Sequence, residues 1–114
     1  MKEAFIVASE IEKCIKSLEK LCKDLDVIGL EKVDAQVNYD KEFQIALEQL
    51  KSEGSAVSTR EKEAKGILAV NGATRRLGLA EIRYKALHTK IEAAKSALNG
   101  WQSYNRHLSV GVRD

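Results

Sequence analysis

The chain has 114 residues, a formal net charge of +2, no proline and only 5% aromatic residues. Hydrophobic residues make up 44% and charged residues 32%, a composition typical of a helical protein with an aliphatic core. This length allows one domain, and no apolar run approaches the roughly 20 residues that a membrane span needs. The first residues also lack the apolar core of a secretory signal. We therefore expect a cytoplasmic protein without membrane contact.

Hydrophobic periodicity predicts an all-α protein with a single domain, whose helices cover about residues 2–28, 39–52, 58–71 and 74–109. Gly29 weakens the first helix, and Asn38 can cap the second. Gly54 is a natural C′ residue for that second helix. Residues 58–61 have the S-x-x-E form of a capping box, which would start the third helix. The Asn-Gly pair at residues 71–72 predicts the strongest internal break.

The last helix carries an apolar stripe with alternating steps of three and four residues. The stripe comprises Leu77, Ala80, Tyr84, Leu87, Ile91, Ala94, Leu98, Trp101, Asn105 and Leu108. A sustained repeat of 3.5 residues requires a facing helix, as in a coiled coil. Asn105 is the polar member of the stripe, and it either fixes the register and partner number or lies beyond a frayed helix end.

The length of this helix predicts a partner for it. A helix over residues 74–109 is about 54 Å long, whereas the first predicted helix reaches only about 40 Å. The exposed remainder would forfeit about 1.5–3 kcal/mol for each large apolar side chain left in water. We therefore expect an elongated antiparallel hairpin or three-helix arrangement that forms a homo-oligomer. Its oligomer seam would comprise Leu77, Tyr84, Leu87, Ile91, Leu98, Trp101, Asn105 and Leu108.

The first helix has a wide apolar face. Its stripe comprises Ala4, Ala8, Ile11, Ile15, Leu18, Cys22 and Leu25, and it is widened by Val7, Cys14, Leu21 and Ile28. Both cysteines fall on this face, about 12 Å apart along the helix, which is too far for a disulfide. We expect two buried, reduced thiols.

Charge divides the chain into an acidic and a basic half. Residues 1–57 carry 8 Lys and no Arg against 12 Asp and Glu, whereas residues 58–114 carry 11 Lys and Arg against 5 Asp and Glu. Arg75, Arg76, Arg83 and Lys90 follow one another along the last helix and could bind phosphate. The alternatives are a solvated face, or pairing with acidic residues of the first helix. Those acidic residues are Glu10, Glu12, Glu19 and Asp24.

Residues 100–108 (GWQSYNRHL) form the densest cluster of recognition-type side chains. Aromatic residues beside arginine suit either a protein interface or base stacking. Trp101 belongs to the apolar stripe, so core packing is its alternative role. The residues expected to contact nucleic acid or a protein partner here are Gln102, Tyr104, Arg106 and His107.

Residues 84–87 (YKAL), 90–93 (KIEA) and 102–108 (QSYNRHL) carry a resemblance to a group of phage proteins. The region from about residue 58 to residue 110 resembles small helical proteins from the early or recombination gene regions of bacteriophages and prophages. The resemblance implies an accessory factor that works near single-strand annealing or replication proteins. It implies no catalytic residue, and the first 57 residues lie outside it.

No catalytic or metal-binding motif is present in the sequence, so we expect a non-enzymatic protein without a cofactor or metal. The first hypothesis is a phage accessory protein of DNA recombination or replication that binds single- or double-stranded DNA, a protein, or both. The alternative is a small inhibitor or interaction module that binds a host defence or nuclease complex. A third hypothesis is an adaptor whose only activity is oligomerisation.

Overall fold

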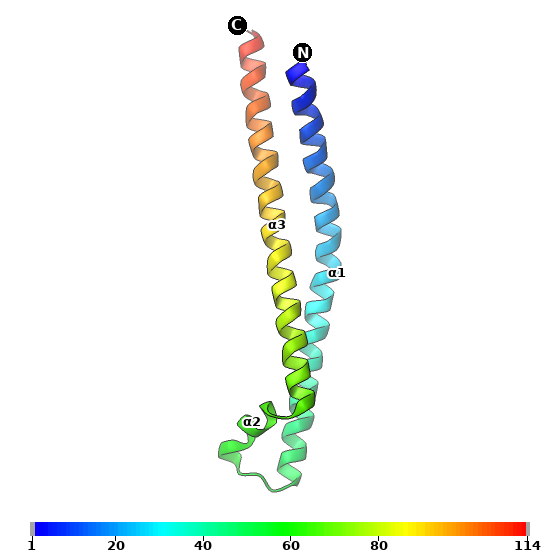
Figure 1. Ribbon diagram of the computed structural model, residues 1–114, viewed down its shortest axis with the longest axis vertical. Coiled ribbons are helices and arrows are strands. Elements are labelled where there is room, and N and C mark those ends of the chain that lie inside the picture. Colours follow the sequence, from blue (N-terminus) through cyan, green and yellow to red (C-terminus); the bar gives the residue numbers. More distant parts are fainter. Residues whose placement is uncertain (1, 114) are drawn as a thin grey trace. The chain divides into compact units, whose positions relative to one another are not determined.

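The structure is a computed structural model that describes residues 2–113, with the side chains of residues 2–109. Three helices account for almost all of this part: α1 (Lys2–Ser52), α2 (Val57–Lys65) and α3 (Leu68–Arg113) (Figure 1). The all-α class and the long C-terminal helix are therefore confirmed. The contacts divide the chain into two compact units. Unit 1 combines the first 26 residues with those from Lys85 onward, and unit 2 comprises residues 27–84.

Residues 2–52 form one continuous helix, and the predicted break between residues 28 and 39 is wrong. Gly29 is not a helix end but an interior position of α1 that faces the ring of Tyr84 in α3. A Cβ atom built on Gly29 would lie 3.9 Å from Cε2 of Tyr84 in α3. Asn38 continues the helix as a half-buried residue and caps nothing. Packing against α3 thus outweighs the cost of about 1 kcal/mol for a glycine in a helix interior.

The end of α1 follows the prediction. Gly54 has a φ of +81°, a conformation that side chains with a Cβ rarely adopt. Its N–H donates to the carbonyl of Lys51 at 3.1 Å, and the N–H of Ser55 donates to the carbonyl of Leu50 at 3.0 Å. These two hydrogen bonds form a Schellman motif with Gly54 at C′.

The short helix α2 begins at Val57, and the predicted capping box is wrong. Ala56 is the N-cap residue and makes no side-chain cap, so Ser58 already lies inside the helix. Arg60 instead holds the loop, because its guanidinium donates to the side chain of Ser55 at 3.1 Å and to its carbonyl at 2.9 Å. The arginine thus ties the loop to the first turns of α2, but as a donor it does not cap the free N–H groups at the helix start.

The break before α3 lies at residues 66–67, not at residues 71–72 as predicted. Ala64 of α2 and Val70 of α3 are both fully buried and form one core with Ala46 of α1. Gly66, the C-cap residue of α2, and Ile67 connect the two helices between Ala64 and Val70. Half-buried residues surround this core of unit 2: Tyr39, Phe43, Leu47, Leu50 and Ile67.

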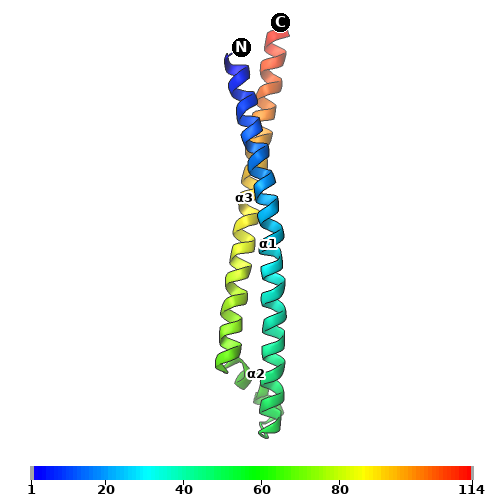
Figure 2. The ribbon, with the colours of Figure 1, turned by 90° about the vertical axis from the view of Figure 1, so that its right-hand side faces the viewer.

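In unit 1, residues 2–26 of α1 run antiparallel to the α3 segment that begins at Lys85 (Figure 1 and Figure 2). The predicted α3 stripe faces inward, since Leu87 is only 4% exposed and Ile91 only 5%. On α1, one edge of the predicted apolar face is exposed to solvent, so this part of the prediction is wrong. The residues that turn inward are Val7, Ile11, Cys14, Leu18, Leu21 and Leu25, whereas Ala4, Ala8, Ile15 and Cys22 are exposed. A single facing helix covers only a narrow seam, and the predicted wide face would have needed two neighbours.

In unit 2, residues 27–52 of α1 pack along the first part of α3. The seam is built largely from small residues, of which Ala35, Ala73 and Ala80 are buried. Leu77 and Tyr84 complete it as half-buried residues. Because α1 extends to Ser52, it accompanies α3 in both units and covers the seam that the sequence assigned to a second chain.

Candidate binding surfaces

All eight side chains expected to contact nucleic acid or a partner are exposed. They are Arg75, Arg76, Arg83, Lys90, Gln102, Tyr104, Arg106 and His107. Unit 2 contains the three arginines from Arg75 to Arg83, and unit 1 contains the other five residues. The residues assigned to the oligomer seam face α1 of their own chain instead.

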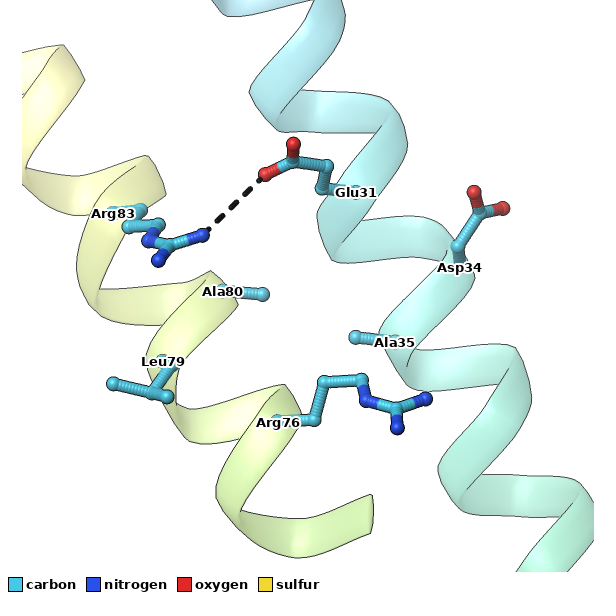
Figure 3. A pocket seen from close by; sticks show the side chains of 7 residues that line it. All are labelled: Glu31, Asp34, Ala35, Arg76, Leu79, Ala80 and Arg83. Carbon is cyan, nitrogen blue, oxygen red and sulfur yellow. Dashed lines mark ion pairs between the residues drawn. The ribbon is translucent and has the colours of Figure 1, made fainter. Parts of the chain in front are cut away.

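The arginines of unit 2 do not form a single cluster. Successive residues of an α-helix are rotated by about 100°, so Arg75 and Arg76 project in different directions. Arg76 and Arg83 are seven residues apart and share one side of α3, beside the seam. Figure 3 shows both guanidinium groups extending toward α1.

Arg76 and Arg83 form one wall of a groove between α1 and α3, with a volume of about 320 Å³ (Figure 3). Glu31 and Asp34 of α1 form the opposite wall, and the buried residues Ala35 and Ala80 lie between the walls. Leu79 lies on the α3 rim. The groove therefore combines an apolar floor with one basic and one acidic wall, all within unit 2.

The charges in this groove are only partly paired. Arg83 Nη1 lies 3.9 Å from Glu31 Oε2, and both side chains are more than half exposed. Pairs of this kind contribute at most about 1 kcal/mol to stability. Arg76 makes no ion pair with any side chain that the structure describes. Both arginines remain accessible to a partner.

Pairing between basic α3 and acidic α1 does occur, but not through the expected carboxylates. Glu10 and Glu12 pair with Lys13 and Lys16 of α1 itself, each at 3.2 Å. The carboxylate of α1 that pairs with a basic side chain of α3 is that of Glu31, which lies farther from the N-terminus than the expected residues. Residues that flank an antiparallel seam on the two helices face each other, and Glu31 and Arg83 occupy such flanking positions.

The other side of the seam in unit 2 has a different chemistry. The Lys32 ammonium lies 4.4 Å from the centroid of the Tyr84 ring, next to Gly29. A cation over an aromatic face gains about 0.5–1 kcal/mol when exposed. A lysine at a seam position also restricts the register in which α1 and α3 can pair. This side lacks the opposed acidic and basic walls of the groove.

The recognition segment of unit 1 is divided between the seam and solvent. Trp101 is half-buried in the seam and contacts Tyr104 edge to face, with ring centroids 6.4 Å apart. Tyr104, Arg106 and His107 lie outside the seam and are exposed. Asn105 is half-buried within a continuous helix, so it occupies a seam position before the helix end.

The two cysteines differ, against the expectation that both are buried. Cys14 is half-buried in the seam of unit 1, while Cys22 is exposed. The seven-residue repeat explains the difference, because Cys14 shares a seam row with Val7 and Leu21 whereas Cys22 lies beside that row. Both thiols are free.

Sequence reasoning missed a row of apolar side chains on the outer face of α1. Val27, Leu30, Val33 and Val37 are 57–62% exposed. Leu30 and Val37 lie on the opposite side of the helix from seam residues such as Ala35. Exposed apolar side chains in a contiguous row are a mark of an interaction surface.

No protein-family model, curated protein or solved structure matches this chain. Within residues 2–113, no helix combines the length and apolar character needed to cross a membrane. The same described residues include no group of three or more His, Cys, Asp or Glu side chains that could hold a metal ion.

Proposed function

We propose that this chain is a non-enzymatic accessory protein of phage DNA recombination or replication, with the outer surface of α3 as its nucleic-acid contact. The observation that carries the proposal is the arrangement of α3 itself. The apolar stripe of α3 packs against α1, whereas the cationic side chains of α3 remain exposed to solvent. The resemblance of residues 58–110 to phage proteins supplies the biological setting.

The basic surface is strongest in unit 1. Residues 85–109 of α3 carry four cationic side chains, Lys85, Lys90, Lys95 and Arg106, against one carboxylate, Glu92, and all five are exposed. Exposed lysine and arginine side chains attract a phosphate backbone. Tyr104 is 45% exposed, so its ring is available to stack on an unpaired base. We therefore expect single-stranded DNA to be the better ligand.

Titration with fluorescently labelled single- and double-stranded DNA at about 50 and 200 mM salt tests this proposal. We expect binding at low salt and a loss of affinity with rising salt, because each neutralised phosphate releases counterions. Lys90→Ala and Arg106→Ala should each weaken binding and lower the salt dependence by about one unit of slope. Lys13→Ala on α1 removes the same charge and should change neither. Absence of binding at about 50 mM salt would remove the DNA contact from the proposal.

A second candidate function is an interaction module that occupies a host defence or nuclease protein. The exposed row of Val27, Leu30, Val33 and Val37 favours it, because nucleic acid does not need aliphatic side chains. This candidate predicts a host protein whose capture is lost with Leu30→Ser and Val37→Ser together, and no salt-dependent DNA binding. Capture unchanged by the double substitution would exclude the row as the contact.

A further inference from the structure

The groove of unit 2 carries opposite charges on its two walls, and this arrangement is self-complementary. Arg76 and Arg83 line the α3 wall, and Glu31 and Asp34 line the α1 wall (Figure 3). We propose that this face is the interface between two copies of the chain, in which each copy lays its α1 wall against the α3 wall of the other. This inference is independent of DNA binding and does not use the predicted oligomer seam.

The positions along the helices fit a two-fold axis that runs parallel to them. Such an axis keeps the level of each residue along the helices and exchanges the two walls. Glu31 lies at the level of Arg83 within one chain, as their 3.9 Å approach shows. In the pair of copies, Glu31 therefore faces Arg83 of the second copy. From the level shared by Glu31 and Arg83, Arg76 lies about 10.5 Å away along α3. Asp34 lies about 4.5 Å away from that level along α1, in the same direction. Both carboxylates therefore lie between the levels of the two arginines.

The floor of the groove allows the two copies to approach closely. Ala35 and Ala80 are small and buried at the floor, so no long side chain fills the space between the two walls. Leu79 on the rim is 57% exposed and would be covered by the second copy. The contact therefore combines apolar burial with charge pairing on both sides of it.

A second copy fits this groove better than nucleic acid does. Glu31 and Asp34 would repel a phosphate backbone laid along Arg76 and Arg83, since the four side chains line the same groove. A fitting partner must present both signs of charge on parallel rows, and a two-fold copy supplies both. Each pairing then occurs twice, which doubles the number of favourable contacts.

The experiment is a charge exchange between two variants, measured as mass in solution by light scattering and analytical ultracentrifugation. One variant carries Arg76→Glu and Arg83→Glu, which makes both walls acidic. The other carries Glu31→Arg and Asp34→Arg, which makes both walls basic. The unchanged chain should reach twice its mass of 12.7 kDa as its concentration rises. Each variant alone should stay at 12.7 kDa, with a dimer dissociation constant raised at least about 100-fold by like-charge repulsion.

Mixing the two variants should restore the dimer, because every acidic wall then meets a basic one. The control is Arg75→Glu, which makes the same charge change on another side of α3 and should leave the dimer constant within about threefold. Far-ultraviolet circular dichroism confirms that each variant keeps its helices. A wild-type chain that stays monomeric up to about 0.5 mM would overturn the proposal, as would dimers that survive both double substitutions or variants that fail to pair when mixed.

Discussion

The burial of Ile91 gives a sharp test of the seam. Ile91 is 5% exposed and Ile82, on the same helix, is 65% exposed. Truncation of a buried isoleucine to alanine costs about 2–5 kcal/mol, and the lower part of this range applies where solvent borders both edges of a two-helix seam. We therefore expect Ile91→Ala to lower the free energy of unfolding by about 2–3 kcal/mol.

Ile82→Ala is the matched control, since the chemical change and the gain in helix propensity are the same. Only about a third of the Ile82 surface is buried, so its removal should cost about 0.5–1 kcal/mol. Each kcal/mol shifts the melting temperature of a chain of this size by about 4 °C. Thermal and urea unfolding followed by circular dichroism at 222 nm measure both variants. Equal melting temperatures for Ile91→Ala and Ile82→Ala would refute the burial of Ile91 in the seam.

Two further predictions concern the glycines and the cysteines. Gly54→Ala should lower the free energy of unfolding by about 1–2 kcal/mol, because Gly54 has a positive φ. Gly72→Ala should raise it by up to about 1 kcal/mol, because the Cβ position of Gly72 inside α3 is surrounded by open space. The same urea titration measures both changes, and a stabilising effect of Gly54→Ala would contradict the helix end described for α1. Cys22 should react with a maleimide faster than Cys14, which single-cysteine variants measure, and equal rates would contradict the half-buried position of Cys14.

The inner face of α3 could be predicted from the sequence because its pattern is strong and local. The stripe residues recur at steps of three and four from Leu77 to Leu108, and every one of these positions turns inward. The facing surface of α1 was harder to predict, since apolar residues such as Ile15 and Cys22 lie directly beside the true seam. Only the choice of a single partner helix decides which of two adjacent apolar rows is buried.

The helix ends show where local signals suffice and where they do not. Gly54 ends α1 through its own backbone conformation, which is a local property. Gly29 and Gly72 are also glycines, which disfavour a helix interior, but both lie inside long helices. For Gly29 the reason is tertiary, because this part of α1 packs against the ring of Tyr84 in α3. Propensity alone cannot reveal such a contact.

The candidate surfaces were predicted in part. Exposure of the cationic side chains on α3 follows from their place outside the apolar stripe. The opposed walls of the groove could not be derived while α1 was expected to end at residue 28, because Glu31 and Asp34 then had no helix to present them. The continuous α1 is what places these carboxylates across from Arg76 and Arg83.

The central claim is that the apolar face of α3 is covered by α1 of the same chain. Hydrogen exchange measured by mass spectrometry over a dilution series tests it most directly, with mass in solution recorded at each concentration. We expect the amides around Leu87 and Ile91 to keep the same protection down to concentrations at which only single chains are present. Protection that disappears on dilution would show that a second chain covers the seam, and would contradict the account.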